Sequence, residues 1–579
     1  MEARLASALQ LAGHEVTYVT CGGVLNRHCV VMAGMHLPAN AAPDLRERAC
    51  RQCRNRAKAV RLEFGLFGPE LDACLGADEL RDIDAYVSDG PTSALIDSKW
   101  HGVPTGRRAL FPFLVYKKKD DLELDAGQWD EYRDQLYQAM VAVSVARRLL
   151  AEYRPDRVVT YSATYSVVSA FLSVARHAGV GDYFVEASGN LAHRTRRAIL
   201  GKTGIIEWFA ALRRIWPDVE HLPANTSMLS EVGDHVVNLI GAISPFSYSA
   251  PSGSDAGRIR DAVRTPEGSK LLLATMSSYD EWFAAEVAGL TQAGATTFES
   301  QLQWLDWLVA YVAQHPEFYL VIRVHPREFP NRRERSGMLS SHARKLELRF
   351  AQLPPNCFIN WPSQMLSLYD LAKAADVVLN AWSSAGKEMA LLGLPVVEWA
   401  PQALLYAPEP RYCGHTPDEY AKCIVLALSD GWCEGNIVRM FRWCALEYGA
   451  ASFIMRDRVS HKSSRTSFFL RASRRIARAR VDAWIAHRDR FPAASLEEIQ
   501  RTLVEGKPFL VREWDGKPQE ETEALAQQIR RMAKALFQDG AMQHREAVAG
   551  IAVDDLRRRL LDAAHRLESN RAQITGGNA

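Results

Sequence analysis

Short apolar runs alternate with stretches of helical periodicity along most of the chain. The runs are rich in Val, Leu and Tyr and predict strands at 157–161, 183–186, 271–274, 319–324, 376–380 and 395–397. The intervening stretches carry apolar side chains at helical spacing and predict helices at 166–179, 298–314, 365–375 and 386–392. Strands that alternate with helices form parallel sheets covered on both faces. The pattern therefore predicts an α/β fold.

The first residues predict a helix followed by a strand. Leu5, Ala8 and Leu9 lie on one helical face. Gly13 is placed to end this helix, and 15–20 is rich in β-branched and aromatic side chains. A doubly wound domain normally opens with a strand before its first helix. Either the given start is late or the first strand of an N-terminal sheet is missing, and either case would weaken that sheet.

A stretch rich in Ser, Pro and Gly predicts a linker between 243 and 269. An α/β series lies on each side of it, and a charged, helical series begins near residue 445. The predicted organisation is an N-terminal, acceptor-side Rossmann-like domain at 1–250, a nucleotide-donor Rossmann-like domain at 251–445, and a helical, partly basic extension at 446–579. A site between the two facing domains is the simplest arrangement.

The composition is that of an ordinary globular protein, with 47% apolar and 24% charged residues. The net charge of +2 argues against general nucleic-acid binding, because no basic excess is available to displace counterions. No run of about 18 apolar residues appears, and the first residues lack the apolar core of a signal peptide. We therefore expect a cytoplasmic protein whose ten cysteines are thiols or metal ligands.

Polar clusters follow four of the predicted strands directly. They begin at Glu186, Ser277, His325 and Ser383. Ligands of open parallel sheets bind beyond the carboxyl ends of the strands. The shared placement therefore predicts one ligand site built from several strand ends.

The cluster after 319–324 is cationic. His325 and Arg327 could neutralise a diphosphate as its sugar bond breaks, and Arg323 could approach from the same face. Pro326 ends the strand and fixes the turn. The alternative is a turn that happens to contain His and Arg.

The cluster after 376–380 leads into a helix. Ser383, Ser384 and Gly386 precede or open it, where unpaired N–H groups attract a phosphate. Glu388 in the first turn could accept hydrogen bonds from a ribose diol. The alternative is that Ser383 only caps the helix and Glu388 is a favourable first-turn charge. Capping and phosphate binding use the same groups, so both interpretations can hold.

Three motifs together resemble the bacterial capsule-polysaccharide biosynthesis glycosyltransferases, relatives of the Kdo and polysialic acid transferases. They are His-Pro-Arg at 325–327, Ser-Ser-x-Gly-x-Glu at 383–388 and Gly-x-Pro-Val at 393–396. The likeness covers 270–400 well and 1–200 loosely. It implies a GT-B fold, with two Rossmann-like domains facing across a cleft. It also implies inverting, metal-independent transfer from a CMP-, CDP- or UDP-linked sugar to a surface polysaccharide or lipid-linked glycan.

By this likeness, His325 and the Ser383–Ser384 loop bind the donor nucleotide and its phosphates, and the Ser277–Glu281 loop lies at the cleft between the domains. The likeness and the strand-end clusters together give the donor-binding residues. The expected set is Ser277, Ser278, Arg323, His325, Arg327, Ser383, Ser384, Gly386 and Glu388. Three other functions stay open. The chain could be a CDP-glycerol-type polyol phosphotransferase, a nucleotide-sugar epimerase, or a non-catalytic assembly partner with a degenerate site.

Inverting transfer needs a base that deprotonates the acceptor hydroxyl. Glu186 is the first candidate, because it ends a strand of the acceptor-side domain. Asp280 and Glu281 are alternatives, and Asp89 is a weaker one. Glu186 could instead be a surface or capping carboxylate. The basic turn at 193–197 could contact an anionic acceptor or simply be solvated.

Cys21, Cys29, Cys50 and Cys53 form an N-terminal cluster in the sequence. Four thiols could bind a structural zinc ion or an iron–sulfur cluster. Free buried thiols are the alternative. Either way, we expect this cluster to be remote from transfer chemistry.

The segment 468–490 interleaves aromatic and aliphatic side chains with arginines. A basic amphipathic helix of this kind can lie on anionic lipid, which predicts contact with the inner face of the plasma membrane. A helix packed on the C-terminal domain with a solvated basic face is the alternative.

Overall fold

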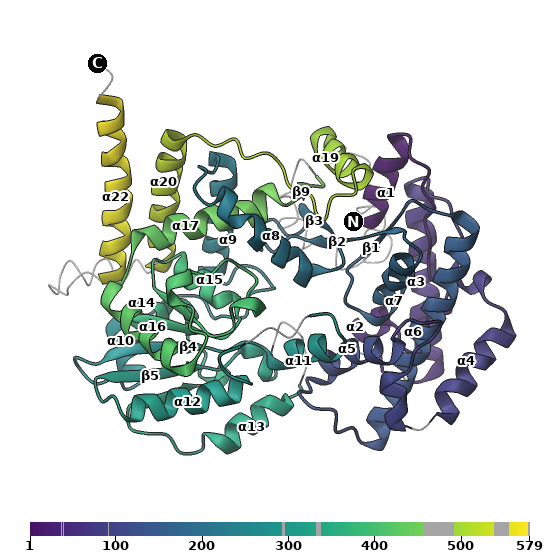
Figure 1. Ribbon diagram of the computed structural model, residues 1–579, viewed down its shortest axis with the longest axis horizontal. Coiled ribbons are helices and arrows are strands. Elements are labelled where there is room, and N and C mark those ends of the chain that lie inside the picture. The colour runs from purple at the N-terminus through teal and green to yellow at the C-terminus, as the bar shows by residue number, and fades with distance from the viewer. Residues whose placement is uncertain are drawn as a thin grey trace, which may run out of the picture.

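The computed structural model describes residues 1–35, 37–38, 40–90, 92–291, 296–331, 337–456, 491–537 and 555–576. Two β-sheets lie in separate halves of the molecule, and helices surround both (Figure 1). The predicted α/β class, with a helical C-terminal region, is confirmed. The basic segment 468–490 lies outside the described residues.

The second sheet is five-stranded and wholly parallel, in the order β6-β5-β4-β7-β8. Its strands are β4 (Lys270–Thr275), β5 (Phe318–Arg323), β6 (Cys357–Asn360), β7 (Val377–Asn380) and β8 (Val396–Glu398). The first strand lies in the centre, as in a Rossmann-like half. Strands of such a sheet are buried on both faces, which explains the near-continuous apolar runs.

The helices of this half flank the sheet (Figure 1). They are α10 (Ala256–Ala262), α11 (Tyr279–Val287), α12 (Gln301–Ala313), α13 (Ser341–Arg349), α14 (Leu368–Ala374), α15 (Ser384–Ala390) and α16 (Pro417–Asp430). The predicted helices at 298–314, 365–375 and 386–392 are therefore confirmed. Every polar cluster predicted at the end of β4, β5 or β7 lies at one edge of this sheet.

The first sheet is four-stranded and mixed. It consists of β1 (Arg157–Tyr161), β2 (Gly181–Ala187), β3 (Arg197–Lys202) and β9 (Phe453–Ile454). Only β1 and β2 are parallel, and the two other pairs are antiparallel. The expected parallel sheet is thus wrong beyond its first pair. The connection from β2 to β3 is too short for a crossover, so the chain reverses direction.

The described residues before Arg157 form helices and contain no strand longer than a single bridge. The helices are α1 (Glu2–Leu11), α2 (Val30–Gly34), α3 (Pro43–Glu63), α4 (Ala77–Asp89), α5 (Thr105–Lys117) and α6 (Ala126–Tyr153). The strand predicted at 15–20 is wrong. This segment pairs only briefly with 67–70, where Tyr18 N donates to Phe67 O at 2.8 Å.

The chain returns to the first half after it completes the second sheet. The helix α17 (Glu434–Ala445) continues into a π-helix at Leu446–Ala450, and β9 then pairs with β3. Beyond 491 lie α19 (Ala493–Val504), α20 (Pro518–Leu536) and α22 (Asp555–Gly576). The helix α20 packs on α22 and on α9 (Thr226–Ile240) (Figure 1).

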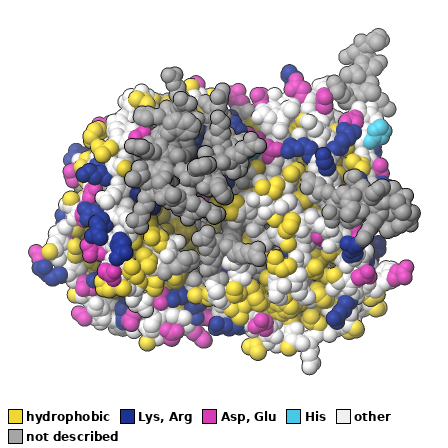
Figure 2. Space-filling model, turned by 180° about the vertical axis from the view of Figure 1, so that it is seen from behind, with side chains coloured by type: hydrophobic (Ala, Val, Ile, Leu, Met, Phe, Trp, Pro, Cys, Tyr) yellow, Lys and Arg dark blue, Asp and Glu magenta, His cyan; other side chains and the backbone are white. Residues whose placement is uncertain are grey.

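The surface mixes charges of both signs. On the face in Figure 2, basic and acidic side chains alternate around the rim, with apolar side chains between them. This agrees with the near-neutral net charge of the sequence. No described helix is long and apolar enough to cross a membrane.

Candidate functional site

Three loops at the carboxyl edge of the second sheet contact one another. Tyr279, after β4, donates its N–H to Glu328 Oε1, after β5, at 3.2 Å. The Tyr279 ring also lies 5.9 Å from the ring of Trp382, after β7. The structure therefore brings together the polar clusters that the sequence places at the ends of β4, β5 and β7.

Arg327 and Asp280 form a buried ion pair within this group. Arg327 also donates to Ser278 Oγ at 3.0 Å and to Val115 O of α5 at 2.9 Å. Its own carbonyl accepts from Lys118 Nζ at 2.6 Å. These contacts hold α5 against the second half of the molecule. The two charges neutralise each other, so neither Arg327 nor Asp280 presents an uncompensated charge to a ligand.

Arg323 differs from Arg327 in its surroundings. It lies at the end of β5, is buried, and donates to Asn360 Oδ1. Among the described residues, no carboxylate lies within ion-pairing distance of it. Burial without a counter-ion lowers the pKa of the guanidinium to about 10. A buried cation with a single neutral acceptor is stabilised by any anion that reaches it.

His325 caps the short 3₁₀ turn that follows β5. Its Nδ1 accepts from Arg327 N at 3.2 Å, and its ring meets the edge of Tyr248 at 5.2 Å between centroids. In the neutral ring, a nitrogen that accepts carries no proton, so the proton lies on Nε2. The turn thus fixes His325 as an Nε2–H donor.

The loop into α15 forms the third part of the edge. Ser383 caps the helix by accepting from Ala385 N at 3.2 Å, as the capping interpretation predicted. Ser384 is exposed and donates to Glu388 Oε1 at 3.1 Å. Tyr369 donates to the other oxygen of Glu388 at 2.7 Å. Burial raises the pKa of Glu388, and the two donors hold its carboxylate in one orientation.

A buried polar network packs against this loop. The sequence patterns did not predict this network. Asn380 accepts from Thr275 Oγ1 at 2.8 Å and donates to Glu398 at 3.2 Å. Tyr406 also donates to Glu398, whose pKa burial raises to about 8. A Cβ on Gly386 would collide with Tyr406 Oη and Asn380 Nδ2. Gly386 is therefore explained by this close approach.

One segment of the linker joins the His325 and Glu388 sides of the edge. Tyr248 contacts the His325 ring, and Ser249 Oγ accepts from Leu368 N at 2.9 Å. Leu368 opens α14, and its neighbour Tyr369 holds Glu388. Ser277 belongs to the same edge, where its N–H donates to Gln301 Oε1 at 2.8 Å.

Glu186 lies near the end of β2 in the first sheet and is half-buried. Burial raises its pKa, which a hydrogen bond from Ser162 and the charge of Arg194 partly oppose. Tyr165 lies near both Glu186 and Glu281, which belongs to the second half. After burial, the charges of Glu281 and then Glu186 raise the pKa of Tyr165. Carboxylates of both halves therefore approach the same tyrosine.

The other predicted acceptor-side residues take structural contacts. Arg197 is buried in an ion pair with Glu231, and His193 Nε2 lies 3.0 Å from Asp234 Oδ2. Arg196 donates to a backbone carbonyl. Asp89 ends α4, far from the second sheet (Figure 1). Of the basic turn, only Arg194 is placed to influence Glu186.

The four N-terminal cysteines lie in one region. The charges of Cys29 and Cys50, after burial, contribute to the raised pKa of Cys53, and the same two thiols act on Cys21. Within the described ranges, however, no group of three or more His, Cys, Asp or Glu side chains is arranged to hold a metal ion. The metal site stays a prediction.

No protein-family model and no curated protein matches the chain. Among solved structures it is similar to Thermosulfurimonas dismutans KpsC, beta Kdo 2,4 transferase, at 14% identity over 52% of this chain and 81% of that one, with a TM-score of 0.30. It is also similar to Methanocaldococcus jannaschii UDP-GlcNAc 2-epimerase, at 13% identity over 58% of this chain and 94% of that one, with a TM-score of 0.25. A third similar structure is the glycosyltransferase SnogD from Streptomyces nogalater, at 13% identity over 76% of this chain and 89% of that one, with a TM-score of 0.19. Likenesses this distant carry no argument about activity, which has to be argued from the geometry of the site.

Proposed function

We propose that the protein is a glycosyltransferase of the GT-B type that binds a nucleotide-activated sugar at the carboxyl edge of the second sheet. The observation that carries this proposal is Arg323. Its buried charge has no carboxylate partner in the described structure, at the sheet edge where α/β domains bind nucleotides. A diphosphate supplies the missing negative charge.

The neighbouring side chains suit the rest of the donor. His325 offers an Nε2–H, which can stabilise the charge that develops on the leaving diphosphate. Glu388, oriented by Tyr369 and Ser384, can accept from the two hydroxyls of a ribose. The proposed contacts for a phosphate, for the leaving group and for a ribose thus come from one edge of the sheet.

Glu186 is the proposed catalytic base. It removes the proton from the acceptor hydroxyl as that oxygen attacks the anomeric carbon, while the bond to the nucleotide breaks and the nucleotide leaves with its electron pair. The raised pKa of Glu186 makes it a stronger base than an exposed carboxylate. Asp280 serves less well, because Arg327 neutralises it in the interior.

We further propose the acceptor class and the location suggested by the motif likeness. The acceptor is a surface, capsule-type polysaccharide or a lipid-linked glycan, and the enzyme works in the cytoplasm on the inner face of the membrane. The half-exposed rings of Tyr161 (45%) and Tyr165 (42%) near Glu186 offer flat apolar surfaces for a sugar ring.

The test begins with nucleotide binding. A bound ligand raises the melting temperature by mass action, so CMP, CDP and UDP are screened by thermal shift. We expect one of them to stabilise the wild type and Arg323→Gln to lose that shift. Arg349→Gln, an exposed arginine of the same half, should keep it. A nucleotide shift unchanged in Arg323→Gln would place the phosphate elsewhere.

Product analysis with the stabilising nucleotide's sugars then identifies the reaction. Glu186→Gln should lower transfer by roughly 10²–10⁴-fold, the usual contribution of a general base, and leave the nucleotide shift intact. If the product carries a transferred polyol phosphate, the protein is a polyol phosphotransferase. If the donor is epimerised and nothing is transferred, it is an epimerase. Either product would contradict the proposed glycosyl transfer.

A further inference from the structure

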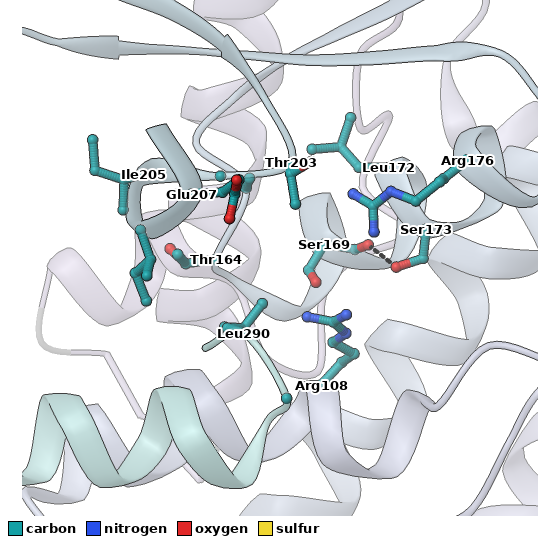
Figure 3. A pocket seen from close by; sticks show the side chains of 14 residues that line it. Arg108, Thr164, Ser169, Leu172, Ser173, Arg176, Thr203, Ile205, Glu207 and Leu290 are labelled. Carbon is teal, nitrogen blue, oxygen red and sulfur yellow. Dashed lines mark hydrogen bonds between the residues drawn. The ribbon is translucent and has the colours of Figure 1, made fainter. Parts of the chain in front are cut away.

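A cavity of about 90 Å³ lies in the first half of the molecule (Figure 3), and none of its lining residues belongs to the proposed donor edge. It is lined by α5, the turn after β1, α7 (Ser166–His177) and the turn between β3 and α8 (Ile205–Val219). Gly289 and Leu290, which follow α11, close it from the second half. The volume is far below the roughly 300–1,000 Å³ of a typical small-molecule site. It suits one small polar group.

Two guanidinium groups from different helices point into this cavity (Figure 3). Arg176 of α7 is paired with Asp182 at 2.5 Å. Arg108 of α5 has no carboxylate within ion-pairing distance in the described part of the chain. Its Nε is buried and has no hydrogen-bond partner among the residues that the structure describes. Burial and the charge of Arg176 lower the pKa of Arg108 to about 10.

The rest of the wall adds hydrogen-bond donors. Ser169 places its hydroxyl beside Arg108, and Thr164 also lines the cavity (Figure 3). The helix α8 begins at the wall after Gly204, and no side chain caps its first N–H groups. The carboxylate that lines the cavity, Glu207, is paired with Arg214 at 2.7 Å. Among the charged side chains described at this wall, that of Arg108 is left without a counter-charge.

We propose that this cavity binds a phosphate group, held by the fork of Arg108, by the charge of Arg176 and by the start of α8. An arginine fork matches phosphate oxygens with two parallel hydrogen bonds. A phosphate removes both the unpaired Nε and the repulsion between the two arginines. The group is either free inorganic phosphate or the phosphate of a larger molecule such as a sugar phosphate. The inference is independent of the proposed transfer reaction.

The test measures melting temperature in sodium phosphate at constant ionic strength, set with sodium chloride. The wild type should gain at least about 2 °C at 5 mM phosphate. Arg108→Gln should gain nothing, and its melting temperature without phosphate should equal or exceed that of the wild type. Arg107→Gln is the matched control, because Arg107 is the exposed neighbour paired with Asp97 at 2.7 Å, and it should keep the gain.

Two more variants test whether the phosphate acts at this cavity. The part of the gain that depends on Arg108 should persist in Arg323→Gln, which separates this cavity from the donor edge. Should Arg108→Gln fail to fold, Arg108→Lys retains the charge without the fork and should lose at least about half of the gain. An undiminished gain in the Arg108 variants overturns the proposal and assigns the effect to general salt exclusion.

Glucose 1-phosphate at the same concentration distinguishes the two sources. A larger Arg108-dependent gain than with inorganic phosphate identifies the phosphate of a larger molecule. An equal or smaller Arg108-dependent gain identifies the free ion. If neither compound gives an Arg108-dependent gain, the cavity does not bind phosphate.

Discussion

At the scale of single residues, Glu398 makes stability depend on pH. Its pKa is about 8 in the folded chain against an ordinary 4.5, because burial outweighs the hydrogen bonds from Tyr406 and Asn380, which lower it. Between these values the unfolded chain binds fewer protons than the folded one, so stability falls as pH rises and levels off above about 8. A tenfold difference in proton affinity between the two states corresponds to about 1.4 kcal/mol of unfolding free energy.

We therefore expect Glu398→Gln, which stays neutral, to flatten this dependence. Denaturant titrations from pH 5.5 to 8.5 should show the variant gaining on the wild type by up to a few kcal/mol as pH rises. Parallel slopes for the two proteins would mean that Glu398 titrates normally.

The placement of several single site residues could be predicted from the sequence. Glu186, Ser277, His325 and Ser383 were predicted at strand ends because apolar runs stop there, and all four lie at or directly beyond such ends. The pairing of Arg327 with Asp280 could not be predicted, because an ion pair between residues 47 positions apart depends on the finished fold. Local sequence locates a polar side chain but leaves open whether a partner neutralises it.

At the scale of elements, strands with strong periodicity were predicted and weakly marked ones were not. All five strands of the second sheet are short, yet four stood out because both their faces are apolar. The strand β3 lies beside an Arg-rich turn and resembled a loop, and its place is set by pairing with β2 and β9. Segment 15–20 has strand composition but lacks a long partner, so it stays a single bridge.

At the scale of elements, we expect the N-terminal cap of helix α6 to contribute measurably to stability. Asp125 accepts from Gln128 N at 2.9 Å, and Gln128 Oε1 accepts from Asp125 N at 3.2 Å, which completes a capping box. Asp125→Ala should cost about 1 kcal/mol of unfolding free energy in urea, and Asp125→Asn should restore most of it. Asp130→Ala, which removes only an exposed pair on the same helix, should be nearly neutral. Equal losses of unfolding free energy in Asp125→Ala and Asp130→Ala would show that the cap does not stabilise the helix.

At the scale of the whole molecule, Glu521 ties the C-terminal helices to the rest. It lies buried in the first turn of α20 and accepts from Arg442 of α17 at 2.6 and 2.8 Å. It also accepts from Ala224 N, just before α9, at 2.8 Å. One carboxylate therefore joins three separate segments.

Glu521→Ala should cost about 3 kcal/mol, because a largely buried arginine and a backbone N–H lose their acceptor. Glu520→Ala is the neighbouring control, since Glu520 forms only an exposed pair with Lys517 and should change stability by less than about 1 kcal/mol. Calorimetry on both variants compares them, and similar melting temperatures would show that the helices are held without Glu521.

The pairing of β3 with β9 has a consequence for how the chain is made. Residue 198 cannot meet residue 453 until the whole second sheet has left the ribosome. Until then the nascent first sheet carries an open edge along β3, the kind of edge on which other chains aggregate. Such distant pairings fold slowly. The protein thus completes its earliest-made sheet late in synthesis, and we expect it to be most prone to aggregation during that interval.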